Sequence, residues 1–148
     1  MLEIISGKLR IAVIDDVEIQ GQYLETMLRT FVTLDVEIEV FTEPKIALEE
    51  IRKGRYFAVF TDIHMDQMMG DDVVREINKM NLGVKTFVLT GDDGFILALN
   101  CFRLGCRDIF LKQPKKKVIK KTVEKIEEDF NNWRNTFEEI QARKKKQA

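Results

Sequence analysis

Five short apolar segments alternate with segments of helical periodicity, and this alternation constrains the fold more than any other feature of the chain. Four of the apolar segments are nearly continuous and rich in Val, Ile and Phe, as in strands buried on both faces: residues 9–14, 56–60, 86–89 and 109–111. Residues 36–41 instead alternate apolar and charged side chains. That pattern is typical of an edge strand with one face in water.

The segments between these strands carry apolar residues at helical spacing. The repeats are Leu24, Met27, Leu28 and Phe31, then Ile46, Ala47 and Ile51 after Pro44, then Val73, Val74, Ile77 and Met80 after Gly70. Repeated β-α units require a mainly parallel sheet with right-handed crossovers and helices on both faces. A single edge-like second strand fits the order 2-1-3-4-5. The predicted fold class is therefore α/β, a flavodoxin-like doubly wound (βα)5 sheet with an extended C-terminal helix.

Composition agrees with a small globular protein. The 148 residues suffice for one domain, and 45% apolar with 33% charged residues is ordinary for a folded chain. No apolar run approaches the length of a membrane span, and the N-terminus lacks the features of a signal peptide. The two cysteines, Cys101 and Cys106, have no metal-like spacing and no partner histidine. We expect reduced thiols in a cytoplasmic protein.

Polar residues stand where four of the predicted strands should end. Asp15 and Asp16 follow the first strand, and Asp62, Thr90 and Lys112 follow three later ones. Because the carboxyl ends of parallel strands meet at one edge of the sheet, ligands bind there. Converging carboxylates repel one another and are relieved by a cation, and an oxygen-only set favours Mg²⁺. Capping of the first helix explains one of the two adjacent acids but not both together with Asp62.

These residues lie in motifs that resemble the receiver domain of bacterial two-component response regulators, which is CheY-like. The resemblance runs from about Leu9 to the start of the last helix. The four motifs are Ile11-Ala12-Val13-Ile14-Asp15-Asp16, Thr61-Asp62-Ile63-His64-Met65 with Gly70, Val88-Leu89-Thr90-Gly91, and Gly105-Cys106-Arg107-Asp108-Ile109-Phe110-Leu111-Lys112. Each motif alone is weak, but their order at the right strand ends is specific.

The resemblance implies a role for each site residue. Asp62 would be the phosphoacceptor, attacking a phosphohistidine of a sensor histidine kinase or a phosphotransfer protein. Asp16 and Asp62 would hold Mg²⁺ with the backbone carbonyl of His64, and Asp15 would act through the water shell of the metal. Lys112 would offset charge on the transferred phosphoryl group. Thr90 would then bond a phosphoryl oxygen and shift the surface around the fourth helix.

Three positions depart from the pattern of the family. Asp66 stands where members usually have Pro, and Gln113 replaces the Pro that usually follows the lysine, with Pro114 displaced by one position. The Lys-Pro bond of the family is generally cis, whereas a cis bond before Gln113 would cost roughly 2.5–4 kcal/mol. We therefore expect a trans or a strained Lys112–Gln113 bond. Ile109 replaces an aromatic residue, which should weaken the usual output route.

His64 is the single histidine of the chain and lies two residues after Asp62. A direct catalytic role would need an orienting partner, and none is evident in the sequence. We expect its side chain to border the site and to affect water access to the acyl phosphate. Asp92, two residues after Thr90, is a second residue that could tune the lifetime of the phosphoryl group.

The last helix carries a strict heptad series. Its apolar residues are Ile119, Val123, Ile126, Phe130, Trp133, Phe137 and Ile140. Since a receiver needs about half of this length to cover its sheet, we divide the chain into a receiver domain, residues 1–129, and a helical extension, residues 130–148. We expect Phe130 to Ile140 to project past the domain and to favour a dimeric coiled coil. A longer intramolecular helix is the alternative.

The fourth helix and the basic clusters offer further surfaces. Phe95, Ile96, Leu97, Leu99 and Phe102 cover more of the helix than one buried stripe needs, which fits either an interface or a wide buried face. Lysines 115–117, 120 and 121 and the basic residues 143–146 lack any accompanying nucleic-acid reading motif. We therefore expect no direct DNA or RNA binding and no membrane binding.

Three functions remain after these arguments. The first is a phosphorylatable receiver in two-component signal transduction, which modifies itself rather than acting as an enzyme, contacts a downstream protein and forms a homodimer through its last helix. The second is a pseudo-receiver scaffold that has lost phosphorylation. The third is a small Mg²⁺-dependent phosphate-ester hydrolase, for which no substrate pocket or acid is evident. The complete acceptor set favours the first, either as a separate protein or as a fragment of a larger regulator.

Overall fold

A computed structural model describes residues 3–91 and 93–147. Five strands alternate with five helices along the chain. Their bounds are β1 (Leu9–Ile14), α1 (Glu18–Phe31), β2 (Val36–Phe41), α2 (Pro44–Arg52), β3 (Ala58–Asp62), α3 (Gly70–Lys79), β4 (Lys85–Thr90), α4 (Phe95–Arg103), β5 (Asp108–Leu111) and α5 (Lys116–Gln147). All strand pairs are parallel, in the order β2-β1-β3-β4-β5. The predicted α/β fold and strand order are confirmed.

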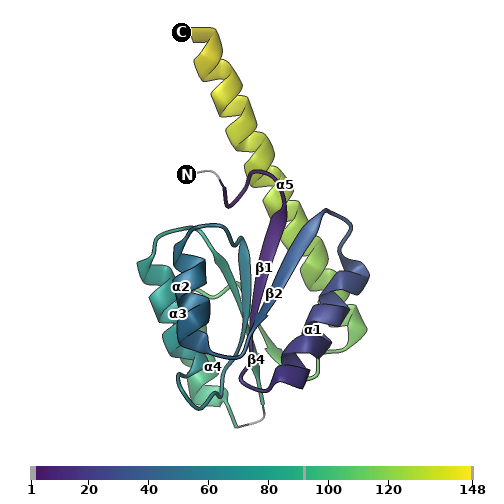
Figure 1. Cartoon of the computed structure of the whole chain (residues 1–148), viewed down its shortest axis with the longest axis vertical. Coiled ribbons are helices and arrows are strands. Elements are labelled where there is room, and N and C mark those ends of the chain that lie inside the picture. Colours follow the sequence, from purple (N-terminus) through teal and green to yellow (C-terminus); the bar gives the residue numbers. More distant parts are fainter. Residues whose placement is uncertain (1–2, 92, 148) are drawn as a thin grey trace.

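Helices cover both faces of this sheet (Figure 1). Helices α1 and α5 pack on one face, where Leu28 of α1 and Ile126 of α5 share a cluster with Ile11 of β1. Helices α2, α3 and α4 pack on the other, mainly through Ile51, Val73 and other aliphatic side chains. Phe57 and Phe130 meet edge to face with ring centroids 5.3 Å apart, which joins the last helix to the sheet.

The strand ends differ from the sequence-based bounds in ways that concern the polar residues. Asp62 and Thr90 are the last residues of β3 and β4 rather than residues that follow them. Their backbones pair with Leu89 and Leu111, and this pairing extends each strand beyond its apolar run. The prediction that the last strand is buried on both faces was wrong. Strand β5 lies at the edge of the sheet, and its Leu111 is 64% exposed.

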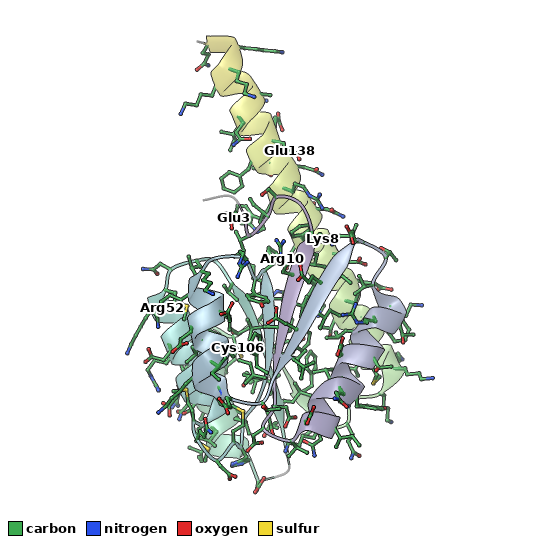
Figure 2. All side chains as sticks on the ribbon, in the orientation of Figure 1. Glu3, Lys8, Arg10, Arg52, Cys106 and Glu138 are labelled. Carbon is green, nitrogen blue, oxygen red and sulfur yellow. The ribbon has the colours of Figure 1, made fainter. Side chains whose placement is uncertain are left out.

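Helix α5 is a single helix of 32 residues, about 48 Å long at 1.5 Å per residue. It starts near the carboxyl edge of the sheet and runs back past the opposite edge (Figure 1). In Figure 2 the label Glu138 marks the part that stands clear of the domain. In the described part of the chain, no helix combines the length and apolarity needed to cross a membrane.

The expectation that the helix leaves the domain at Phe130 was wrong. Phe130 is fully buried, and Phe137 packs against the edge of the same core, as does Ile4 of the N-terminal segment. Ile5 of that segment belongs to the same buried cluster. Trp133 and Ile140 are about half exposed, and they are the large apolar residues of the heptad series that stay exposed to solvent.

Candidate functional site

Three carboxylates converge at the carboxyl edge of the sheet. Asp15 and Asp16 follow β1 and Asp62 ends β3, its neighbour in the sheet. One oxygen from each of the three lies within 4.8 Å of the others. Asp62 is only 2% exposed, and its Oδ1 has no hydrogen-bond partner among the described residues. A buried carboxylate oxygen without a partner is costly, so this atom is available for a ligand.

The two adjacent acids are oriented by backbone contacts. Asp15 Oδ1 accepts a hydrogen bond from the Val17 amide at 2.9 Å, just before α1 begins. Asp16 Oδ2 accepts one from the Asp66 amide at 3.0 Å, which ties the end of β1 to the loop after β3. Neither acid caps α1, because the N-cap residue is Val17 and no side chain among the described residues caps the helix, so the capping alternative was wrong. Asp15 instead orders the link between β1 and α1.

The ionisation of Asp15 is perturbed by its surroundings. The pKa of its carboxyl is raised to about 6, chiefly by burial and also by the charges of Asp62 and Asp16. The hydrogen bond from the Val17 amide and the charge of Lys112 oppose this rise. The carboxyl group is therefore reluctant to ionise without a cation beside it. This is the behaviour expected of a group that gives up its proton when a metal binds.

Lys112 reaches the centre of the cluster. Its Nζ lies 3.1 Å from Asp62 Oδ2. The described residues contain no cis peptide bond, so the Lys112–Gln113 bond is trans, one of the two predicted outcomes. Gln113 adopts a φ of +55°, in the left-handed region that side chains other than glycine occupy at some cost. The backbone thus turns at Gln113 by a strained torsion where the family uses a cis proline, and Lys112 still contacts Asp62.

Thr90 lies at the same edge, at the end of β4, and is buried. Its hydroxyl donates to the carbonyl of the next residue, Gly91, at 3.0 Å. The sequence placed Thr90 at the correct edge of the sheet. Nothing in the sequence indicated the direction of its hydroxyl, which depends on the packing of the loop after β4.

His64 lies two residues after Asp62, and its side chain faces the loop after β4. Its Nε2 lies 3.6 Å from Asp93 Oδ1, which is a charge contact only when the imidazole is protonated and is longer than a hydrogen bond. The sequence did not indicate this pairing, since Asp93 lies on the loop after β4. Asp92, the residue considered for the same region, lies outside the described residues.

Gly70 allows α3 to approach the site closely. A Cβ at this position would lie 2.5 Å from the carbonyl oxygen of Asp62 and 2.7 Å from Ile63 Cα. The Gly70 amide also donates to the Ile63 carbonyl at 2.8 Å. A side chain at residue 70 would therefore push the first turn of α3 away from the backbone beside Asp62.

A cavity of about 470 Å³ opens beside the carboxylates. Asp62 and Lys112 form its polar end, and its remaining wall comes from β1, α1, β4 and the loop after β5: Val13, Ile14, Asp15, Ile19, Gln20, Tyr23, Leu24, Leu89, Gln113 and Pro114. Ile19 and Tyr23 are both more than half exposed at its rim. The sequence did not reveal this cavity, because its walls come from four separate segments.

The donor set fits a hard divalent cation. The three carboxylates supply only oxygen ligands, and no donor among the described residues bonds the buried Oδ1 of Asp62. Mg²⁺ prefers oxygen ligands and binds through few carboxylates while it keeps several waters. Asp16, Asp62 and the carbonyl of His64 are the predicted direct ligands, and the convergence of the carboxylates supports the first two.

Residues 11–124 match the response regulator receiver domain, which is more than half of the chain. The chain belongs to the response regulator receiver family. The matched part includes most of β1, the other four strands and the first turns of α5. A receiver is not an enzyme in the usual sense, and the acidic cluster has the position of a receiver's phosphoacceptor and metal site.

Known proteins show the same fold. The signal receiver domain of a Luxo repressor protein from Vibrio parahaemolyticus is 17% identical with a TM-score of 0.74, covering 84% of this chain and 94% of that one. The receiver of AraT from Geobacillus stearothermophilus is 23% identical with a TM-score of 0.73, covering 85% and 98%. The 3',5'-cyclic-nucleotide phosphodiesterase regA of Dictyostelium discoideum is 26% identical over 138 residues. That match covers 90% of this chain but only 17% of regA, so the receiver spans about a sixth of this relative.

Proposed function

We propose that this receiver accepts a phosphoryl group on Asp62 from a phosphohistidine, in a Mg²⁺-dependent reaction, and thereby changes its contacts with other proteins. The observation that carries the proposal is the state of the Asp62 carboxylate. It is almost fully buried, one oxygen contacts Lys112, and the other has no partner among the described residues. A carboxylate with this surrounding is held ready for an electrophile rather than used to stabilise the fold.

The reaction requires positioning more than covalent chemistry from the protein. An Asp62 oxygen attacks phosphorus, the new bond is a mixed anhydride, and the bond from phosphorus to the imidazole nitrogen of the donor breaks. The electron pair and the imidazole stay with the donor protein. A bound Mg²⁺ would offset charge on the phosphoryl oxygens, held by Asp16 and Asp62 with the carbonyl of His64. Lys112 adds a second positive charge on the opposite carboxylate oxygen.

The position of Lys112 favours this function over a pseudo-receiver scaffold. The departure at Gln113 would disable the site if it turned the lysine away. Instead, the trans bond and the left-handed Gln113 leave the ammonium 3.1 Å from Asp62. The charge that the transfer needs is therefore available without the proline of the family.

The cavity beside Asp62 supports a protein donor. Its polar end is the acceptor carboxylate, and exposed Ile19 and Tyr23 of α1 lie at its rim. An imidazole ring entering along these side chains would meet Asp62 while its flanking residues cover apolar surface. A sensor histidine kinase or a phosphotransfer protein presents a phosphohistidine in this way, so we place such a partner on the α1 side.

The decisive experiment is acyl phosphorylation in vitro. Wild-type protein is incubated with Mg²⁺ and a small phosphodonor such as acetyl phosphate, and its intact mass is measured. We expect one added phosphoryl group, sensitive to hydroxylamine, and no adduct for Asp62→Asn. The matched control is Asp66→Asn, an exposed acid that meets the cluster through its backbone amide. An unlabelled wild type, or equal labelling of Asp62→Asn, would falsify the proposal.

The output surface proposed for a downstream protein is the exposed face of α4. Phe95 and Phe102 are 74% and 71% exposed, and Ile96 beside them is nearly as open. These exposures support the interface alternative for the fourth helix over a wide buried face, since in α4 only Cys101 is buried. Helix α4 begins at Phe95, five residues beyond Thr90, so a movement at Thr90 is close to this face.

We also propose that a second copy of the chain pairs along the end of α5. Trp133 and Ile140 continue the heptad series above the domain, with Trp133 stacked on Phe137 at 6.0 Å. This part of the helix supports a two-stranded seam.

Solution mass tests the pairing of the helices. Trp133→Glu with Ile140→Glu should convert a dimer to a monomer, whereas Asn132→Glu with Asn135→Glu, at exposed polar positions of the same stretch, should not. Truncation after Asp129 is unsuitable because it removes Phe130 from the core. A wild-type monomer at concentrations of about 100 μM would refute the seam.

A further inference from the structure

The hydroxyl of Thr90 is engaged by its own loop. It donates to the Gly91 carbonyl at 3.0 Å, and the Gly94 amide donates to the same carbonyl at 3.2 Å. Thr90 is only 7% exposed, so little water competes for the hydroxyl. The side chain on which phosphoryl sensing would depend is therefore held by the loop that leads into α4.

Gly94 makes this arrangement possible. It adopts φ −91° and ψ 18°, torsions that other residues also populate, so the backbone itself does not demand glycine. A Cβ on residue 94 would overlap the Thr90 hydroxyl oxygen and lie 3.2 Å from Thr90 Cβ. Glycine is thus needed here because the hydroxyl occupies the space of the missing methyl group.

We propose that Gly94 is a positioning residue, which holds the Thr90 hydroxyl on the loop and away from the phosphoryl site until Asp62 is phosphorylated. The proposal rests on the proposed function, because Thr90 must have a phosphoryl group to move toward. It goes beyond that function by naming what keeps the receiver in its resting state. Because Gly94, which precedes α4, packs directly against the Thr90 hydroxyl, a change in the Thr90 rotamer alters the packing at the start of α4.

The geometry of threonine predicts what Gly94→Ala would do. The three substituents on Thr90 Cβ have a fixed order, and the side chain occupies staggered rotamers. Beside the Cβ methyl group of an alanine at residue 94, only the hydrogen on the Thr90 Cβ fits. The rotamer that places this hydrogen there moves the hydroxyl to the position now held by the Thr90 methyl group. The Gly91 bond is then lost, and the equilibrium shifts toward the released hydroxyl.

The first readout is the Thr90 rotamer itself, measured by scalar couplings across χ1 in metal-free protein. Wild type should populate one rotamer, and Gly94→Ala should populate another. Wild type should also leave its resting rotamer when Mg²⁺ and beryllofluoride, a phosphoryl analogue, are added. This last measurement needs no variant, so it tests the proposal even if Gly94→Ala folds poorly. A wild-type rotamer that is the same with and without bound analogue would overturn the proposal.

The second readout is the affinity for beryllofluoride in the presence of Mg²⁺. Removal of the competing hydrogen bond should tighten binding by Gly94→Ala about fivefold, the effect of one net hydrogen bond. In a Thr90→Ala background the same substitution should change the affinity by less than about twofold, because no hydroxyl remains to be released. Thermal unfolding establishes that each variant is folded.

The outcomes separate this inference from the proposed function. Wild type that binds no beryllofluoride and takes up no phosphoryl group refutes both. Wild type that does both, with Gly94→Ala binding no more tightly, refutes the inference alone. An equal gain in the Thr90→Ala background also refutes it, since the effect would then come from the loop and not from the Thr90 hydroxyl.

Discussion

Glu127 of α5 bonds the turn that follows the C-terminal end of α1. Its replacement tests whether α5 is anchored to the domain at this point. The side chain lies on α5 and is 9% exposed. Its Oε2 accepts hydrogen bonds from the amides of Thr33 and Leu34 at 2.9 and 2.8 Å, and the Thr33 hydroxyl lies 3.1 Å from both carboxylate oxygens. One carboxylate thus orders the turn between α1 and β2.

We expect Glu127→Ala to lower the free energy of unfolding by about 2–3 kcal/mol. The change leaves two backbone amides without their acceptor, at about 1–3 kcal/mol each when buried, and exposure of the turn at Thr33 places the effect at the lower end. Glu127→Gln should cost about 1 kcal/mol, because its amide oxygen still accepts both bonds but without the help of a full charge. For a domain of this size, 2–3 kcal/mol corresponds to a fall in Tm of about 5–10 °C.

Urea denaturation followed by circular dichroism measures these differences. Glu128→Ala is the matched control, since it removes the same side chain one residue along on the exposed side of α5, where changes stay within about 0.5 kcal/mol. The expected order of stability is control, Glu127→Gln, Glu127→Ala. A Glu127→Ala variant as stable as the control, or one more stable than Glu127→Gln, would show that α5 is not anchored through this carboxylate.

Two further predictions concern the site. The pKa of Asp15 is raised to about 6, chiefly by burial, so its carboxyl binds a proton more tightly in the folded than in the unfolded state. In metal-free protein the contribution of Asp15 to the free energy of unfolding therefore falls as pH rises from about 4 to 6. Since Mg²⁺ needs the ionised carboxylate, the rise in Tm on adding Mg²⁺ should be larger at pH 8 than at pH 5; an equal rise at both would contradict the role of Asp15. Gly70→Ala should destabilise by about 1–3 kcal/mol, because its Cβ meets the backbone at Asp62 and Ile63 rather than a movable side chain. Gly91→Ala, where Asp93 Oδ1 at 3.3 Å is the nearest atom, should unfold close to wild type in the same urea titration.

The fold could be predicted because its signal lies in every segment. Continuous apolar runs and helical repeats alternate along the chain, and the rules for parallel sheets leave few arrangements of such units. The acids could be placed for the same reason, since Asp15, Asp16 and Asp62 each follow or end a strand and therefore meet at one edge. The strand bounds were less accurate because backbone pairing, and not apolarity, decides where β3 and β4 end.

The remaining features depend on contacts between distant parts of the chain. Glu127 and Thr33 are 94 residues apart, and an acid at helix spacing looks like any solvated side chain. Phe137 appeared to lie beyond the domain because the N-terminal Ile4 and Ile5, which share its core, have no recognisable pattern. The sequence carries no signal that distinguishes Gly94 from an ordinary turn residue. Its purpose depends on the rotamer of Thr90, which only packing decides.

The positions of these contacts bear on how a signal would leave the site. The route through α4 is short, since Thr90, the Gly91 carbonyl and Gly94 lie in sequence and lead straight into the helix that exposes Phe95.

The route through α5 is long. That helix starts four residues after Lys112, but the buried Phe130 and the Glu127 anchor hold its first half against the sheet. A tail fixed in this way can move only with the whole domain. Ile109 also lacks the aromatic ring that usually reports the switch. Besides its backbone bond to the Lys112 amide, Thr90 contacts the loop before α4 through its hydroxyl, and we propose that the signal leaves by this loop. A phosphorylation-dependent partner should therefore respond to changes on α4, whereas pairing through Trp133 and Ile140 should persist in both states.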